Sequence, residues 1–177
     1  YPPAHVQQLW GLYDVPHYVR NLFNIPVVAY SGEVDKQIQA ARVMEKAFQD
    51  QGQTLPHIIG PKMGHKYHPD SLKEIMKRMD QAVKQGPVKL RQQVHLQTRT
   101  LRYSRMYWVQ VTGLGQHWQD ARVDAQLLDG GGDKDLFAQA HGGRVVGLGV
   151  DDGHAPTLLV DDESQGHSPL VQQRFKD

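Results

Sequence analysis

The chain has 177 residues, 39% hydrophobic and 22% charged, which suffices for one medium domain or two small ones with buried cores. With 20 basic and 19 acidic residues the net charge is +1, so nothing in the charge favours nucleic acid or an anionic membrane as partner. No apolar run is long enough to span a bilayer, and the lack of cysteine excludes disulfides, thiolate metal sites and a cysteine nucleophile.

The first half of the chain alternates short apolar runs with segments of helical period. The expected elements are a short helix over 18–23, buried strands over 25–30 and 55–59, and helices over 37–51 and 71–85. This order predicts a parallel sheet with covering helices. Two strands alone cannot bury such a sheet, so we expect the remaining strands to precede Tyr1 in a longer protein.

The helix over 71–85 carries the clearest apolar stripe, which is expected to pack in the core. Ser71 and Glu74 have the spacing of a capping box at its start, and Gly86-Pro87 is a typical stop. Helical periodicity disappears after this point. We therefore predict an α/β domain over 1–86 and a second domain over 87–177.

The second half reads as short strands separated by turn residues. Strands are expected over 94–100, 106–111, 121–128, 136–140, 145–150 and 157–160, with a loop over 129–133. This spacing predicts an all-β, sandwich-like module. Tyr107 and Trp108 fall within one predicted strand, so one of them should face the core, and the polar tail from Asp161 is expected to be mobile.

Two residues suited to catalysis follow the two predicted parallel strands. Asp35 lies just beyond the first strand, and His65 lies beyond the second, after Gly64, which can allow a sharp turn. Active sites form at the carboxyl ends of parallel strands, so the two loops should lie side by side. A histidine can take a proton from a serine hydroxyl, and a carboxylate can hold that histidine in the required tautomer.

The sequences around these residues resemble a known family. Residues 24–37, NIPVVAYSGEVDKQ, resemble the acid loop of prolyl oligopeptidase-family serine peptidases, and residues 57–69, HIIGPKMGHKYHP, resemble their histidine loop. Residues 88–160 look like the β-rich extension that follows the hydrolase domain in a bacterial subgroup. The resemblance implies catalytic roles for Asp35 and His65 in an α/β-hydrolase whose substrate is a peptide or an ester. The lack of cysteine does not fix the compartment, and a periplasmic or secreted location is an expectation only.

The nucleophile of such an enzyme is missing from this sequence. A Gly-x-Ser-x-Gly motif is expected upstream of the acid loop, but no serine here has that context; the serines are Ser31, Ser71, Ser104, Ser164 and Ser168. We therefore expect the chain to be the inactive C-terminal portion of a serine hydrolase. The alternative is a non-catalytic binding or structural module on a hydrolase-like scaffold.

Simpler interpretations exist for each candidate residue. Asp35 can be a helix N-cap and His65 a loop histidine bonded to backbone. The cluster of His57, His65, His68 and Asp70 suggests a metal site only weakly, since it lacks helical His spacing, and no metal or cofactor is expected. The remaining interpretations are solvated charges for Glu33 and Lys36, a pocket wall or buried support for Tyr67, and a ligand platform for Trp108 or Trp118.

Overall fold

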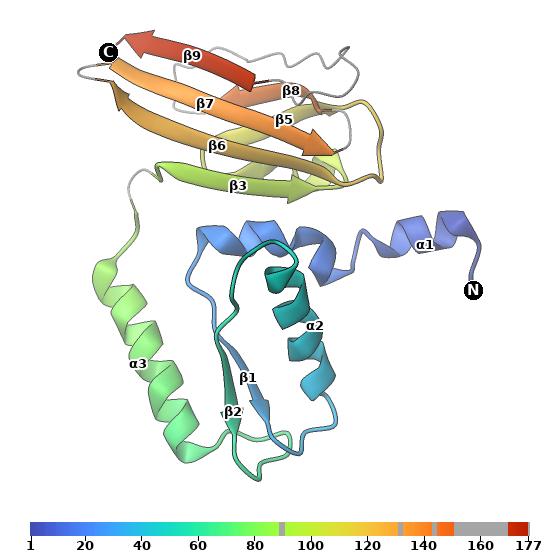
Figure 1. The fold of residues 1–177 in the computed structure, drawn as a ribbon, viewed down its shortest axis with the longest axis vertical. Helices are drawn as coiled ribbons and strands as arrows, with labels where there is room; N and C mark the ends of the chain where they lie inside the picture. Colours follow the sequence, from blue (N-terminus) through green and yellow to red (C-terminus); the bar gives the residue numbers. More distant parts are fainter. Residues whose placement is uncertain (89–90, 131–132, 143–144, 151–169, 177) are drawn as a thin grey trace. The chain divides into compact units, whose positions relative to one another are not determined.

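The protein is described by a computed structural model that covers residues 1–88, 91–130, 133–142, 145–150 and 170–176 (Figure 1). It has mixed α/β structure, with one parallel and two antiparallel sheets. The chain forms two compact units. The α/β unit is Ile25–Lys89, and the β unit combines Tyr1–Asn24 with Leu90–Asp177. The predicted division after residue 86 lies close to that after Lys89, but the first 24 residues belong with the β unit and not with an α/β domain over 1–86.

The α/β unit has the predicted order of strand, helix, strand, helix. Its elements are β1 (Ala29–Gly32), α2 (Ile38–Gln49), β2 (His57–Gly60) and α3 (Pro69–Gln85). The strands are parallel, with Ala29 opposite His57 and Gly32 opposite Gly60, and Figure 1 shows them between the two helices. The first strand begins at Ala29 and not at residue 25. Pro26 lies in the part that is not strand, and it has no N–H to donate to a neighbouring strand.

Two expectations for α3 were wrong. His68 is the N-cap and Pro69 the first helical residue, without a side-chain cap, so Ser71 and Glu74 do not form a capping box. The apolar stripe is also largely exposed, from 39% at Leu72 to 78% at Val83. The two-stranded sheet offers α3 little surface to cover. The predicted stop at Gly86 is confirmed, since this residue has a φ of 68° that favours glycine.

In the part that the structure describes, the β unit has two antiparallel sheets and three short helical segments. One sheet has the strand order β3-β6-β7-β9 and the other β4-β5-β8. The strands are β3 (Gln93–Thr98), β4 (Arg105–Met106), β5 (Val109–Leu114), β6 (Ala121–Gly130), β7 (Asp133–Gly142), β8 (Val145–Val150) and β9 (Leu170–Lys176). The helical segments are α1 (Ala4–Trp10), η1 (Val15–Asn24) and η2 (Leu101–Tyr103).

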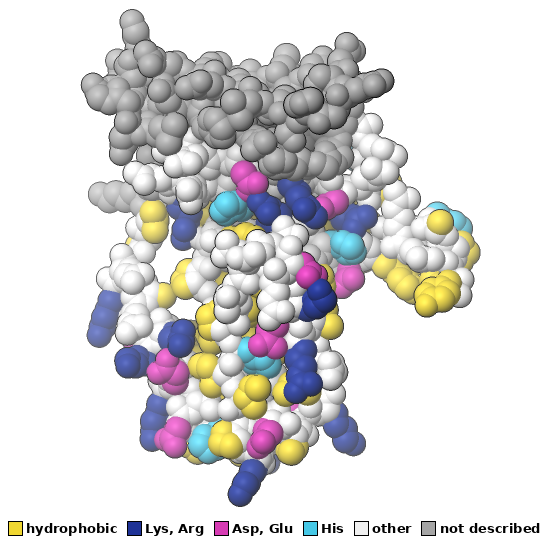
Figure 2. Space-filling model, viewed as in Figure 1, with side chains coloured by type: hydrophobic (Ala, Val, Ile, Leu, Met, Phe, Trp, Pro, Cys, Tyr) yellow, Lys and Arg dark blue, Asp and Glu magenta, His cyan; other side chains and the backbone are white. Residues whose placement is uncertain are grey.

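Alternating residues of both sheets form one hydrophobic core. Its members are Val94, Leu96, Trp108, Val109, Val111, Leu114, Ala121, Val123 and Ala125. The buried alternate residues of β3 and β6 match the alternation seen in the sequence. By contrast, α1 buries no residue, and its hydrophobic side chains are visible on the surface in Figure 2.

The predicted strand over 106–111 is interrupted by a turn. Met106 pairs with Val109, so Tyr107 and Trp108 form a two-residue hairpin loop, with Tyr107 at a φ of 51°. Hairpin turns normally contain glycine, asparagine or aspartate, and none of these marks this one in the sequence. Trp108 is 6% exposed and its indole N–H donates to the Arg91 carbonyl at 2.7 Å. It is the member of the pair that faces the core, which disfavours its use as a ligand platform.

The C-terminal region differs from the expectation of a mobile polar tail. Residues 170–176 form β9, which pairs with β7, Leu170 opposite Gln139 and Lys176 opposite Asp133. The predicted strand over 157–160 lies outside the described residues. Residues 129–130 and 133 belong to the long β6–β7 hairpin, so the predicted loop over 129–133 is shorter than expected.

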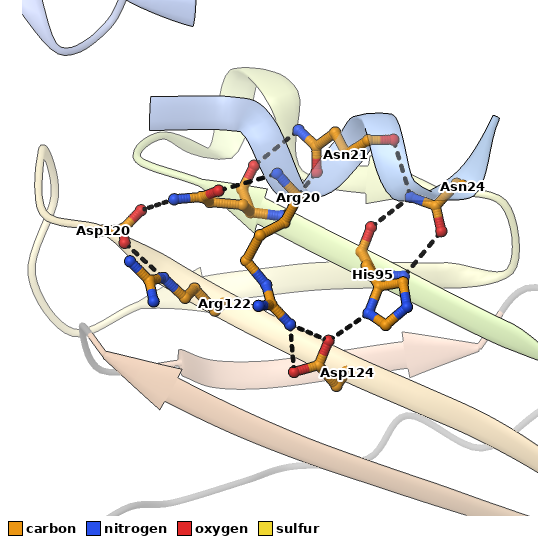
Figure 3. Close-up of polar contacts among 8 residues, drawn as sticks. Arg20, Asn21, Asn24, His95, Asp120, Arg122 and Asp124 are labelled. Atoms are coloured by element: carbon orange, nitrogen blue, oxygen red, sulfur yellow. Dashed lines mark hydrogen bonds and ion pairs between the residues drawn. The ribbon is translucent and has the colours of Figure 1, made fainter. Parts of the chain in front are cut away.

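Segment η1 joins the β unit by covering the outer edge of β3. The Asn24 side chain accepts a hydrogen bond from the His95 N–H at 2.9 Å and donates to the His95 carbonyl at 2.6 Å. Asn21 does the same at Gln97, with distances of 2.7 and 2.9 Å. Each amide imitates the backbone of a neighbouring strand (Figure 3). These bonds give partners to backbone N–H and carbonyl groups at the edge of β3 that could otherwise pair with a strand of another chain.

A charged cluster joins η1 to β3 and β6 (Figure 3). Asp124 accepts hydrogen bonds from the Arg20 guanidinium at both oxygens and lies 2.5 Å from His95 Nδ1. Burial acts to raise the pKa of Asp124, but the His95 hydrogen bond and the Arg20 charge outweigh it, and the pKa is lowered. The carboxylate is therefore more acidic in the folded protein than in the unfolded chain.

We predict that this cluster makes the β unit sensitive to acid. Because the folded pKa of Asp124 lies below the unfolded value of about 3.9, its stabilising contribution is complete above that pH and disappears as pH falls through the folded pKa. All three tryptophans, Trp10, Trp108 and Trp118, lie in the β unit, so urea unfolding followed by their fluorescence reports on it. Asp124→Asn should flatten the loss of stability below about pH 4, and an unchanged profile would contradict this role.

Candidate active site

The two loops after β1 and β2 lie at the same edge of the parallel sheet, as predicted. Asp35 follows β1 and His65 follows β2. Asp35 Oδ2 lies 3.0 Å from His65 Nδ1, a hydrogen-bond distance. The expected proximity of these two residues is confirmed. Because the strands pair in register through Gly32 and Gly60, the sheet itself brings the loops together.

Backbone hydrogen bonds hold the two loops against each other. The Glu33 N–H donates to the Gly60 carbonyl, and the Val34 N–H donates to the Met63 carbonyl, both at 2.9 Å. The Glu33 carboxylate accepts from the Lys62 N–H at 2.7 Å, where Lys62 has a φ of 56°. Glu33 is thus more than a solvated charge, because it bridges the acid loop to the histidine loop.

Gly32 is the glycine that the close approach of the loops requires. A Cβ atom at Gly32 would lie 2.1 Å from the Gly64 carbonyl oxygen and 2.3 Å from that of Met63. Gly64, expected from the sequence to allow a sharp turn, has no left-handed φ and open space around its missing Cβ. The sequence pointed to the wrong glycine because the clash at Gly32 comes from a loop about 30 residues away.

Replacing Gly32 with Ala should separate the loops and weaken the Asp35–His65 contact, because backbone oxygens cannot yield as a flexible side chain can. The measurement is the NMR chemical shift of the His65 imidazole. Replacing Asp35 should change this shift in the original chain but not in the Gly32→Ala chain. Gly64→Ala is the matched control and should leave the spectrum and the free energy of unfolding nearly unchanged. Equal effects of the two substitutions would contradict this account.

Tyr30 anchors the histidine loop from beneath. Its hydroxyl donates to the Lys66 carbonyl and accepts from the His68 N–H, both at 2.8 Å, so it bonds on both sides of the segment after His65. Gly60 makes room for it, because a Cβ there would lie 2.2 Å from the hydroxyl oxygen. The sequence predicted Tyr30 only as a strand residue, and its place in the apolar run carried no signal of this role.

The electrostatics of the pair suit a base oriented by a carboxylate. The Gln37 N–H, which donates to Asp35 Oδ1 at 2.9 Å, and the His65 hydrogen bond lower the pKa of Asp35. An ionised carboxylate only accepts, so in a neutral imidazole this contact favours the tautomer with its proton on Nδ1, which leaves Nε2 as the basic atom. The Asp35 side chain is 10% exposed and that of His65 is 78% exposed. The carboxylate is thus shielded while the imidazole is open to a reactant.

The interpretation of Asp35 as a helix N-cap is wrong. The N-cap of α2 is Gln37, and the bond from the Gln37 N–H to Asp35 closes a turn before the helix. That bond uses Oδ1, whereas His65 contacts Oδ2. Asp35 therefore closes this turn through Oδ1 and contacts His65 through Oδ2 at the same time.

A small pocket of about 170 Å³ adjoins the pair, lined by Tyr30, Asp35, His65, Lys66 and Tyr67. The Tyr67 ring is 58% exposed and its centre lies 4.7 Å from that of Tyr30, so Tyr67 forms a wall of the pocket and is not buried beneath the loop. The volume is below the range of about 300–1,000 Å³ that is usual for complete ligand sites.

The two serines of the α/β unit are buried and offer no exposed hydroxyl. Ser31 and Ser71 are 6% and 8% exposed, and Ser104 lies in the β unit. Ser164 and Ser168 lie outside the described residues.

Two residues of the cluster considered for a metal site, His57 and Asp70, have other partners. The His57 side chain is buried with Nδ1 3.1 Å from Glu45 Oε2, and Asp70 pairs with Lys73 at 2.9 Å. In the part of the chain that the structure describes, no three His, Asp or Glu side chains gather as a metal site would require. Nor does any helix among these residues combine the length and hydropathy needed to cross a bilayer.

Comparison of the chain with protein-family models, curated proteins and solved structures found no match.

Proposed function

We propose that Asp35 and His65 are the acid and base of a Ser-His-Asp triad in a serine hydrolase of the prolyl oligopeptidase type. The observation that carries this proposal is the 3.0 Å contact between Asp35 Oδ2 and His65 Nδ1 at the carboxyl ends of adjacent parallel strands. The resemblance of both loops to that family points to the same two residues. The nucleophilic serine comes from residues outside these 177, because no serine here has the Gly-x-Ser-x-Gly context.

In this mechanism His65 Nε2 takes the proton of the serine hydroxyl as the oxygen attacks the carbonyl carbon of the substrate. Asp35 stabilises the imidazolium that forms and keeps Nε2 directed outward. His65 then returns the proton to the leaving amine or alcohol. A peptide and an ester are both suitable substrates, since the acid and base do not distinguish between them.

The proposal extends to the fold of each unit. The α/β unit is proposed to be the last part of an α/β-hydrolase sheet, which its parallel strands, connecting helix and half-exposed α3 support. The β unit is proposed to be a sandwich-like appendage, supported by two antiparallel sheets whose side chains share one core.

An activity-based probe tests the missing nucleophile. The chain alone should show no stoichiometric labelling by an activated phosphonate, because an unactivated serine without an oxyanion hole reacts slowly. A longer protein that joins these residues to the Gly-x-Ser-x-Gly segment should be labelled at that serine. Labelling of any of the five serines of this chain would overturn the proposal in its present form.

The binding-module alternative predicts a different outcome. If the α/β unit is only a scaffold, no longer protein containing it will react with the phosphonate, even when a serine motif precedes it. The exposure of His65 and its contact with an ionised carboxylate favour the enzyme, since a purely structural histidine gains little from an open Nε2.

A further inference from the structure

A second pocket lies in the β unit, between the segment from Leu12 to Asn21 and the turn from Arg102 to Met106. Its volume is about 660 Å³, within the range of about 300–1,000 Å³ of small-molecule sites. It belongs to a different unit from Asp35 and His65, so an inference about it does not rest on the proposed function.

The pocket has an aromatic wall supported by the core. The rings of Tyr18 and Tyr103 meet edge to face, with centres 6.2 Å apart and planes at 89°. Met106 packs against the hydrophobic core, and the Ser104 carbonyl accepts the Val111 N–H of β5 at 2.8 Å. These contacts hold the wall in place before any ligand arrives, which reduces the entropy lost on binding.

Arg102 offers the pocket a cationic group on an aromatic ring. The pocket lining contains two arginines and no Asp or Glu. The Arg102 guanidinium carbon lies 5.9 Å from the centre of the Tyr103 ring, and among the described residues this side chain has no carboxylate partner. An arginine placed on an aromatic ring can bind a planar carboxylate through two parallel hydrogen bonds.

Tyr18 adds a polar group without a partner. Its hydroxyl oxygen is buried and makes no hydrogen bond among the described residues. Burial raises the pKa of Tyr18, so the hydroxyl remains a protonated donor. A buried donor without an acceptor is unfavourable, and the penalty is relieved if a ligand supplies the acceptor.

We propose that this pocket binds a small ligand that carries a carboxylate on an aromatic body, with Arg102 binding the carboxylate and the Tyr18–Tyr103 wall contacting the ring. The ligand's carboxylate complements the Arg102 guanidinium, and its ring complements the tyrosines. The C-terminal residue of a peptide and a free aromatic acid share this chemistry.

Three probes separate these contributions in NMR titrations of the 177-residue chain. N-acetylphenylalanine has both ring and carboxylate, its C-terminal amide has no charge, and acetate has no ring. N-acetylphenylalanine should shift the backbone resonances of Tyr18, Tyr103 and Ser104, the amide should bind roughly tenfold more weakly or worse, and acetate should not bind measurably. A tripeptide ending in phenylalanine, compared with N-acetylphenylalanine, distinguishes a peptide terminus from a free aromatic acid. Equal affinity for acid and amide, or shifts elsewhere in the chain, would overturn the proposal.

Two substitutions test the assigned residues. Arg102→Gln should reduce the affinity for N-acetylphenylalanine to that for its amide, because only the charge contact is removed. Tyr18→Phe keeps the ring but removes the hydroxyl, so it should lower the affinity for both N-acetylphenylalanine and its amide. Arg42→Gln, at an exposed site on α2, is the matched control and should bind as the original chain does. Unchanged binding in Arg102→Gln would refute the site even if the amide binds weakly.

Discussion

Replacing His65 with Ala is expected to abolish turnover in the longer protein that supplies the serine. Without the imidazole the serine hydroxyl keeps its proton, and the loss in kcat should be on the order of 10⁶-fold, the scale known for removal of a triad histidine. The side chain is 78% exposed, so the free energy of unfolding should change by only about 0.5 kcal/mol or less. Steady-state kinetics with a chromogenic peptide substrate and urea unfolding measure the two effects.

A matched histidine controls for general damage. His5 is exposed on α1, and His5→Ala should leave both activity and stability unchanged. If His65→Ala retains activity, or loses activity only in proportion to lost stability, then His65 is loop structure and the triad assignment fails.

Replacing Asp35 with Asn is expected to reduce kcat by about 10⁴-fold, since the amide no longer favours the imidazole tautomer with a basic Nε2. The substitution is nearly isosteric, and the amide oxygen can still accept the Gln37 N–H, so the turn before α2 should survive. The measurement is kcat and KM with the same substrate. KM should change little, because Asp35 acts through His65 and does not touch the substrate.

Asp50→Asn serves as the control for Asp35→Asn, because Asp50 is an exposed carboxylate paired with Lys46 at the end of α2. It should keep full activity. A loss in Asp35→Asn that appears in KM and not in kcat would indicate that Asp35 contacts the substrate and does not orient His65.

The sequence predicted those features that depend on local periodicity. Apolar alternation located β3 and β6, and the order of elements in residues 25–85 predicted the parallel pair. From that pair it followed that Asp35 and His65 lie at one edge, since parallel strands present their carboxyl ends together. The proximity that underlies their 3.0 Å contact is therefore a consequence of the order of elements along the chain.

Other features depend on residues that are distant in sequence. Gly32 matters because of carbonyls in the histidine loop, and Tyr30 matters because of backbone groups at Lys66 and His68. The pairing of Met106 with Val109 places a turn at Tyr107 and Trp108, where β-prone residues predicted a continuous strand. No local pattern contains this information.

The composition and residue pattern of the sequence determined the mixed α/β character, the change near residue 86 and the two candidate catalytic residues. Only the tertiary structure decided that the first 24 residues join the β unit, because the amides of Asn21 and Asn24 bond to β3 more than 70 residues later. It also decided how far the α3 stripe is exposed. Propensity acts between near neighbours along the chain, whereas hydrogen bonding and burial depend on which distant segments meet.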